Sequence, residues 1–343
     1  MHSVLDDHPA LGVAIRKLLS GELTAINAAD LMARVNSQTK SIPLTRMEVW
    51  ERTIRAELWA AERDTSKGLW KFWVRPRRFT SWLDLCSHDG RKREAALRVT
   101  SGGAPSAFLL ALALRRLNDW VPQVRCAARE ILPVLASNSA PQDVASALWS
   151  LLAHWNTWGR MEPADRDALA AIASVEPVSL ALRSNIMDAT VGPAALVLSQ
   201  CARSVIFDSW IQDFAQGAVQ PTVRARAFRW LFVGQTSWVV GHRWMWTDLA
   251  YCKGKIEPIF ESRGIPVSQS FKMTFDAAMA DRSPMVRRVA AEFLIRELPS
   301  LGAHALPLAQ RLASDTSPSV AERGQFALRQ LNHKTLAKPK NAA

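Results

Sequence analysis

The sequence predicts an all-α fold, an α-solenoid of short helical hairpins behind an N-terminal helical cap. Three observations lead to this prediction: a phrase that recurs along the chain, apolar residues spaced three and four apart within each copy, and a scarcity of β-branched runs. Apolar residues at this spacing share one face of a helix. A single pair of such helices cannot bury that face by itself, so successive pairs are expected to stack.

The cap is predicted over residues 1–80, because the terminal units of a solenoid depart from its repeat. Within it, residues 9–20 and 22–35 are typical of two short amphipathic helices. Residues 45–63 predict a third, longer helix with apolar residues at helical spacing.

One face of this third helix is expected to be buried. Its apolar residues are Met47, Trp50, Ile54, Leu58 and Ala61. Two Glu–Arg pairs four residues apart, Glu48/Arg52 and Glu51/Arg55, are expected on its exposed side, where they would stabilise the helix.

The repeated phrase defines an array over residues 81–332. The segments DWVPQVRCAAREIL at 119–132 and DRSPMVRRVAAEFL at 281–294 share an Asp, a Pro three residues later and then a Val-Arg pair. Residues 315–328 keep the Asp, the Pro and the Val, and residues 221–231 keep the Pro, the Val and the Arg. The Asp is expected to cap the incoming turn, and the Pro presets the first turn of a helix.

The spacing of the phrases indicates helix pairs of about 32 to 34 residues. One such interval separates Arg93, in a looser copy, from Arg125, and another separates Arg287 from the equivalent position of the last copy. The interval from Arg224 to Arg287 is nearly twice as long, which corresponds to two such units. Residues 233–268 hold two glycine-punctuated segments, and we expect them to form a degenerate repeat with a longer loop.

In these phrases the chain resembles the HEAT-repeat family, over residues from about 82 to 331. The resemblance implies stacked helix pairs that work by binding rather than by catalysis. It also implies an internal Asp–Arg ladder between successive repeats, with Asp119/Arg125 and Asp281/Arg287 as its pairs. The residues assigned to this ladder are Asp119, Arg125, Arg224, Asp281 and Arg287.

Composition places the chain among globular proteins, with 48% hydrophobic and 22% charged residues. The net charge of +12 favours nucleic acid, anionic lipid or an acidic protein as a partner, without choosing among them. The four cysteines form no CxxC pair, which predicts reduced, buried thiols in a cytoplasmic protein. Neither a signal peptide nor a membrane-spanning run is predicted. Residues 333–343 are expected to form a disordered basic tail.

Residues 67–82 combine cations with aromatic rings, and they begin a basic region, residues 67–98, that contains the first candidate site. Basic groups neutralise phosphates or acidic side chains, and rings stack on bases. The candidate residues for an anionic partner are Lys67, Lys71, Arg75, Arg77, Arg78, Arg91 and Lys92. Trp70 and Trp73 are candidate aromatic anchors. Alternatively, the rings dock the cap onto the first repeat while the cations point to water.

A second aromatic cluster contains Trp230, Trp238, Trp244 and Trp246. If these rings are exposed, Trp244 and Trp246 are candidate anchors for a partner. The alternative interpretation is that the rings fill the core, since tryptophan is usually largely buried.

The sequence contains no Gly-rich phosphate loop, no GxSxG, no HExxH and no paired-cysteine metal motif. We therefore predict no enzyme, cofactor, metal site or small-molecule substrate, and no membrane partner. Two hypotheses remain. The first is a scaffold that binds a protein partner over an extended surface. The second is a nucleic-acid-associated protein that grips phosphates through residues 67–98 and the C-terminal repeats. Some HEAT-like proteins remove alkylated bases from DNA, but their functional residues match no positions here.

Overall fold

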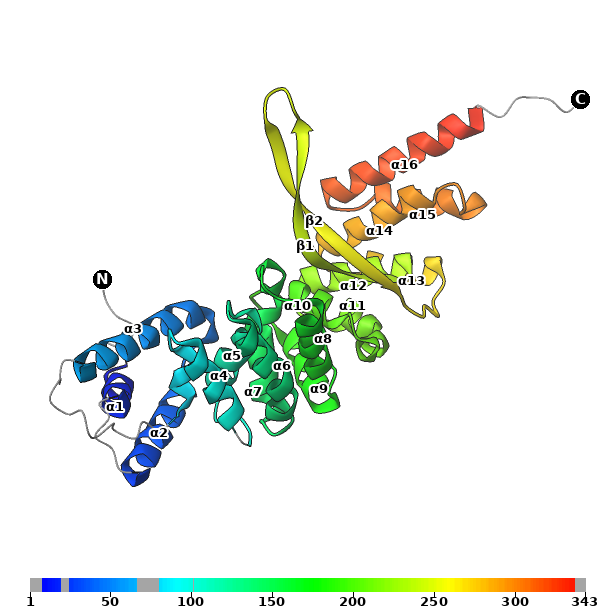
Figure 1. Ribbon diagram of the computed structural model, residues 1–343. Coiled ribbons are helices and arrows are strands. Elements are labelled where there is room, and N and C mark those ends of the chain that lie inside the picture. The colour runs from blue at the N-terminus through cyan, green and yellow to red at the C-terminus, as the bar shows by residue number, and fades with distance from the viewer. Residues whose placement is uncertain (1–7, 20–24, 67–79, 101, 337–343) are drawn as a thin grey trace, which may run out of the picture. The chain divides into compact units, whose positions relative to one another are not determined.

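The computed structural model describes residues 8–19, 25–66, 80–100 and 102–336 (Figure 1). Within these ranges the chain forms sixteen α-helices, six short 3-10 helices and one two-stranded sheet. The protein is therefore mostly helical, as predicted. It divides into two compact units, residues 1–182 and 183–343.

The first unit begins with three helices from the predicted cap. Its helices are α1 (Pro9–Leu19), α2 (Ala25–Thr39), α3 (Met47–Ser66), α4 (Gly90–Val99), α5 (Ala107–Leu114), α6 (Pro122–Ser137), α7 (Pro141–Leu152) and α8 (Pro163–Ala173), and α9 (Glu176–Asp188) continues into the second unit. The predicted face of α3 is buried at Met47, Trp50, Ile54 and Leu58. Helices α4, α6 and α8 pack side by side in this order, and α5 packs on α7.

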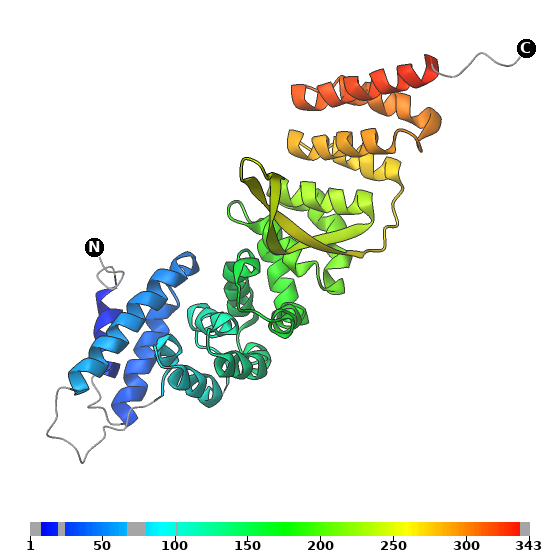
Figure 2. The same ribbon diagram turned by 45° about the horizontal axis from the view of Figure 1, so that its top comes forward.

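The second unit repeats this arrangement. Its helices are α10 (Ala194–Cys201), α11 (Ile211–Gly217), α12 (Pro221–Val233), α13 (Phe271–Met279), α14 (Pro284–Glu297), α15 (Ala305–Ala313) and α16 (Pro318–Leu336). Helices α12, α14 and α16 pack side by side, and the pairs α13–α14 and α15–α16 form successive layers (Figure 2). Helix α16 continues through Leu336, into the segment predicted as a tail, and residues 337–343 lie outside the described residues.

Proline starts the second helix in the copies of the phrase that contain it, as predicted. Pro122, Pro221 and Pro284 are the first residues of α6, α12 and α14, where the fixed dihedral angle suits a helix and the missing N–H costs nothing. The aspartates of the phrase accept backbone hydrogen bonds in the turns that precede α6 and α14. The carboxylate of Asp119 accepts the backbone N–H of Val121 at 2.9 Å, and the same bond recurs in the other two copies of the phrase that contain the Asp.

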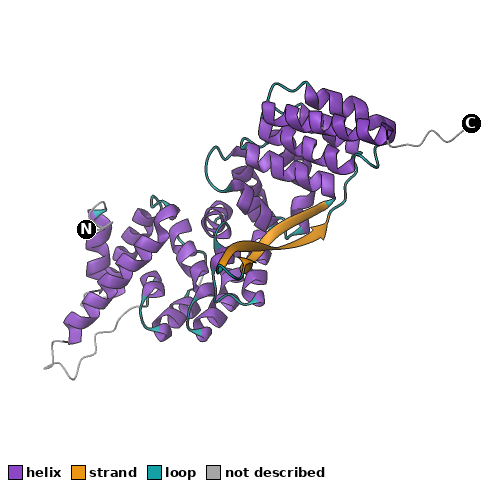
Figure 3. Cartoon of the chain, turned by 90° about the horizontal axis from the view of Figure 1, so that it is seen from above, coloured by secondary structure: helices purple, strands orange, loops and turns teal. Residues whose placement is uncertain are grey.

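The expectation of a degenerate helical repeat at residues 233–268 is wrong. Strands β1 (Gln235–Asp248) and β2 (Lys253–Gly264) form an antiparallel hairpin there, coloured orange in Figure 3. Gly234 ends α12 in the left-handed conformation, with a φ of 71° that favours glycine. The following aromatic and β-branched residues suit an extended strand.

The hairpin also corrects the number of helix pairs expected between Arg224 and Arg287. Helices α12 and α14 pack directly on each other, although the interval between Arg224 and Arg287 is long enough in sequence for two helix pairs. This interval therefore contains one helix pair and an inserted hairpin, rather than two helix pairs.

Candidate binding surfaces

The phrase arginines form bidentate ion pairs that connect neighbouring helix pairs. Arg93 donates to both carboxylate oxygens of Asp119, at 2.8 and 2.7 Å. Arg287 pairs with Asp315 in the same way, at 2.7 and 2.9 Å. Arg224 pairs with Asp281 at 2.6 and 2.9 Å, across the inserted hairpin in sequence. We call each of these arginine–carboxylate pairs a rung.

The ladder therefore has a different pairing from the one the resemblance implies. Within its own phrase, each arginine contacts the backbone: Nη1 of Arg125 donates to the carbonyl oxygen of Asp119 at 3.0 Å, and Arg287 makes the same bond to Asp281. The carboxylate of each rung comes from the next helix pair. Arg125 follows this rule with Glu162, which stands in place of an aspartate, at 2.9 Å.

A second set of ion pairs neutralises outward-facing cations on the same helices. Arg98 on α4 pairs with Glu130 on α6 at 2.9 Å, and Arg229 on α12 pairs with Glu292 on α14 at 2.7 Å. The charges of Arg98 and Arg229 are therefore already neutralised within the fold.

Glu51 is buried, which contradicts the expectation that it lies on the exposed side of α3. Its carboxylate bonds Arg55 at 2.8 Å, Arg115 at 2.8 Å, and also Arg116. Burial alone would raise the pKa of Glu51, but attraction to Arg116 and Arg115 outweighs it and holds the pKa at about 2. Since Arg116 also contacts Asp119 at 3.2 Å, this network joins α3 to the first rung.

Much of the predicted basic site lies outside the described residues: Lys67, Trp70, Lys71, Trp73, Arg75, Arg77 and Arg78. The two remaining candidates, Arg91 and Lys92, lie in the first turn of α4. Arg91 is exposed, and within the described part of the chain it has no carboxylate partner.

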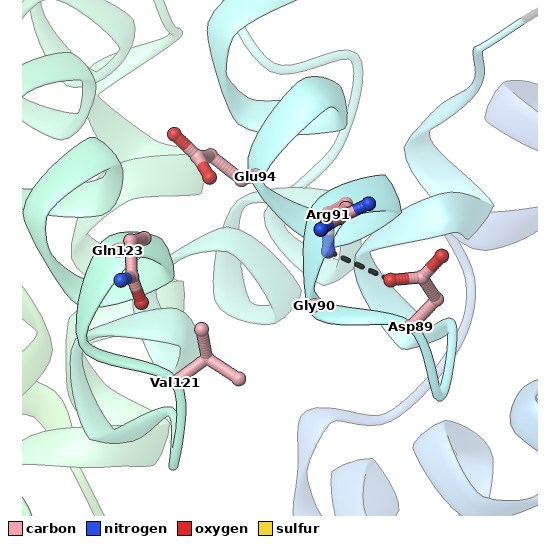
Figure 4. A pocket seen from close by; sticks show the side chains of 6 residues that line it. All are labelled: Asp89, Gly90, Arg91, Glu94, Val121 and Gln123. Atoms are coloured by element: carbon pink, nitrogen blue, oxygen red, sulfur yellow. Dashed lines mark hydrogen bonds between the residues drawn. The ribbon is translucent and has the colours of Figure 1, made fainter.

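An open pocket of about 370 Å³ lies between the starts of α4 and α6 (Figure 4). It is lined by Asp89, Gly90, Arg91, Glu94, Val121 and Gln123. Asp89 caps α4 by accepting the backbone N–H of Arg91 at 2.9 Å. Gly90 has no side chain, which leaves room for Val121 to approach the start of α4. The lining contains acidic and basic side chains together with the apolar side chain of Val121, so the pocket suits a partner surface that is both polar and apolar.

Two exposed tryptophans lie close to the chain segments that line this pocket, and neither was singled out from the sequence. Trp59 is 59% exposed and its ring lies 6.5 Å from that of His88, next to Asp89 in the chain. Trp120 is 65% exposed and precedes Val121. We call Trp59, His88, Arg91 and Trp120 the tryptophan patch. The sequence did indicate that both side chains are exposed, because Trp59 falls outside the apolar face of its helix and Trp120 lies in the turn before Pro122.

The second aromatic cluster divides into a buried and an exposed part. Trp230 and Trp238 are buried, as the core interpretation requires, but Trp244 and Trp246 are 51% and 54% exposed. Their rings contact each other edge to face, with centroids 5.5 Å apart. The core interpretation is therefore wrong for these two residues.

The base of the hairpin is fixed to the helices of the second unit. Arg263 on β2 makes a bidentate ion pair with Asp208, at 2.8 and 2.5 Å, and donates to the backbone oxygens of Ala202 and Ser204. On β1, the carbonyl oxygen of Val239 accepts a bond from Gln200 of α10 at 3.0 Å. The hairpin therefore has a rigid attachment.

One face of the hairpin is apolar and uncovered. Side chains opposite each other on paired strands lie on the same face, and so do those two residues further along. The register pairs Trp244 with Ile256 and Trp246 with Gly254, and Phe260 lies four residues beyond Ile256. Trp244, Trp246, Ile256 and Phe260 are all exposed, and we call them the aromatic face.

The cysteines differ from the expectation of four buried thiols. Cys86 and Cys201 are buried, whereas Cys126 on α6 and Cys252 at the hairpin tip are exposed. Burial raises the pKa of the Cys86 thiol to about 12. The buried thiols are therefore protonated and unreactive near neutral pH.

No protein family, curated protein or solved structure matches this chain. Among the residues that the structure describes, no three His, Cys, Asp or Glu side chains gather where they could hold a metal ion. Within the same residues, no helix has both the length and the apolar character needed to cross a bilayer.

Proposed function

We propose that this protein is a non-catalytic, HEAT-like helical-repeat scaffold that binds a protein partner through the tryptophan patch. The observation that carries the proposal is the pair of largely exposed indoles, Trp59 and Trp120, each near a chain segment that lines the pocket. The rungs support the HEAT-like part of the proposal, because they connect successive helix pairs in one repeated geometry.

The chemistry of the patch favours a protein over a nucleic acid. Tryptophan and arginine are the residue types that contribute most to the binding energy of protein interfaces. The pocket carries Asp89 and Glu94 beside Arg91, and two carboxylates would repel a phosphate backbone. An apolar contact with a polar rim is typical of a specific protein interface.

Affinity capture with the full chain tests this proposal. A nuclease-treated lysate is passed over the immobilised protein and washed at about 0.5 M salt, where the Debye length is only a few ångströms. We expect one defined protein to be retained by the wild type and lost with the double variant Trp59→Ser/Trp120→Ser. The double variant Trp244→Ser/Trp246→Ser removes two indoles of similar exposure and should retain the protein. Equal retention by all three forms would contradict the proposal.

A second candidate function, nucleic-acid association, is favoured by one observation in the C-terminal helices. Within the described residues, Arg282, Arg288 and Arg329 have no carboxylate partner. If they grip phosphates, retention of DNA or RNA falls steeply between low and moderate salt. A gel-shift series of increasing salt measures this, and the triple variant Arg75→Glu/Arg77→Glu/Arg78→Glu tests the contribution of the basic segment. Unchanged retention in that variant excludes the segment from the contact.

A further inference from the structure

The distal half of the hairpin has apolar side chains on both faces and at its tip. Trp244 and Ile256 lie on the aromatic face, and Met245 lies on the opposite face, paired with Lys255. Leu249 and Tyr251, in the turn between the strands, are about three-quarters exposed. Soluble surfaces rarely gather so many large apolar groups without a partner.

Near the tip the strands carry three cations and two acids, an excess of one positive charge. Asp248 accepts the backbone N–H groups of Ala250 and Tyr251, at 3.0 and 3.2 Å, so its carboxylate is directed into the turn. Glu257 pairs with Lys255 at 2.9 Å. Glu257 is also opposite Arg243 in the strand register, although within the described residues its ion pair is with Lys255. Lys253 lies over the ring of Tyr251 at 5.5 Å. The tip therefore combines indole, phenol and aliphatic groups with one excess positive charge.

We propose that the hairpin tip docks on the surface of an anionic phospholipid bilayer, with its tryptophans and tyrosine at the level of the headgroups. This proposal departs from the sequence-based prediction of no membrane partner, which considered only segments that span a bilayer. Indole and phenol rings favour the boundary between water and acyl chains. Lysine and arginine beside them attract lipid phosphates. The insertion is shallow, because the outer edges of a two-stranded sheet carry unpaired N–H and C=O groups that need water or headgroups.

Two other occupants fit the hairpin less well. A groove in a protein would cover one face of the hairpin, but Met245 and Ile259 leave the opposite face partly apolar as well. A second copy of this chain would bring the same cations to the contact, and each copy carries a net charge of +12. A bilayer surface surrounds the tip on all sides and is negatively charged.

The geometry of Trp244 adds to this inference. Its indole lies against Gly254 of the opposite strand, where a β-carbon would overlap the ring. The ring is therefore held in place across the hairpin while about half of its surface faces solvent. An anchor fixed in this way loses little side-chain entropy when it inserts. The inference is independent of the proposed function, since it uses no residue of the tryptophan patch.

Vesicle sedimentation tests the inference with the full chain. We expect the wild type to pellet with phosphatidylcholine vesicles that contain phosphatidylglycerol, to pellet far less with pure phosphatidylcholine, and to be released by salt. The double variant Trp244→Ser/Trp246→Ser should bind the anionic vesicles at least about tenfold more weakly. The matched control Trp59→Ser/Trp120→Ser should bind like the wild type. Failure of the wild type to bind, or equal loss in both variants, overturns the inference.

A fluorescent label at Cys252 gives a second reading that needs no tryptophan variant. An environment-sensitive dye is attached to Cys252 in a Cys126→Ser background, and to Cys126 in a Cys252→Ser background. With anionic vesicles we expect a blue shift of emission from the tip label and no shift from the label on α6. If the tip label keeps the emission wavelength of a dye in water when anionic vesicles are added, the inference is overturned. It is also overturned if sedimentation velocity shows that the wild type self-associates and that Trp244→Ser/Trp246→Ser does not, because the tip would then contact a second copy.

Discussion

Replacing Glu51 with glutamine should destabilise the protein by about 3 kcal/mol at pH 7. The substitution keeps the size of the side chain but removes the charge that Arg115 and Arg116 surround. Glu51 has a pKa of about 2 in the folded state, against an ordinary value of 4.5. At about 1.4 kcal/mol for each pKa unit, this difference corresponds to about 3 kcal/mol. The value agrees with the roughly 3–5 kcal/mol lost when one partner of a buried ion pair is removed.

The pH dependence of this effect provides a stricter check. Because the folded pKa lies below the unfolded one, the charge on Glu51 stabilises the fold above about pH 4.5, and this stabilisation is lost as the pH falls towards 2. Urea unfolding of wild type and Glu51→Gln should therefore differ by about 3 kcal/mol at pH 7 and by less than half of that at pH 3.

A control on the same helix separates charge from helix propensity. Glu48 is exposed, so Glu48→Gln should change the free energy of unfolding by no more than about 0.5 kcal/mol at either pH. If the wild type and Glu51→Gln differ by the same amount at pH 7 and pH 3, the buried network does not hold the Glu51 pKa low. A difference near zero at pH 7 would refute the reasoning entirely.

Three further predictions concern packing, the rungs and the thiols. Gly324→Ala should lower the free energy of unfolding by about 1–3 kcal/mol, because its β-carbon would overlap the backbone of α15, whereas Gly159→Ala meets open space and should be nearly neutral in urea unfolding. Arg287→Lys keeps the charge but loses the bidentate bond, so thermal unfolding should show a free energy of unfolding lower by about 1–3 kcal/mol. An unchanged free energy of unfolding would show that the rungs do not stabilise the fold. Only the exposed thiols, those of Cys126 and Cys252, should react quickly with an alkylating reagent at pH 8, and mass spectrometry that found fast labelling of a buried thiol would contradict the packing.

The sequence predicted the helices well where local chemistry decides them. Pro122 and Pro284 begin helices because their fixed dihedral angle acts within one turn. The apolar spacing of α3 correctly predicted that Trp50 and Leu58 are buried. The same local rule failed for Glu51, whose environment comes from Arg115 and Arg116, in a distant part of the chain.

The hairpin could not be predicted from an alternation of apolar and polar residues along its strands. A half-buried strand shows apolar residues at every second position, but Trp244, Met245 and Trp246 are consecutive and all exposed. The inserted hairpin also lengthened the sequence spacing between two copies of the phrase. The two residues of a rung lie 28 apart for Arg287 and 57 apart for Arg224, so the spacing suggested an extra pair of helices that does not exist.

The tryptophan patch was missed for a related reason. Trp59 and Trp120 belong to widely separated segments of the sequence, and only the folded structure brings each of them near a segment that lines the pocket. The basic stretch before Trp82 is recognisable in the sequence because its residues are contiguous. A surface assembled from separate segments leaves no such local signal.

The two ends of the hairpin are hydrogen-bonded neighbours: the N–H of Ile265 donates to the carbonyl oxygen of Gly234 at 3.0 Å. Residues 235–264 thus leave and rejoin the helices at nearly one point, and α12 and α14 still touch. Closing that gap after excision requires almost no rearrangement of the chain. The position is therefore a natural site for grafting, where a different appendage could be exchanged for the hairpin and the Arg224–Asp281 bond would still form beneath it.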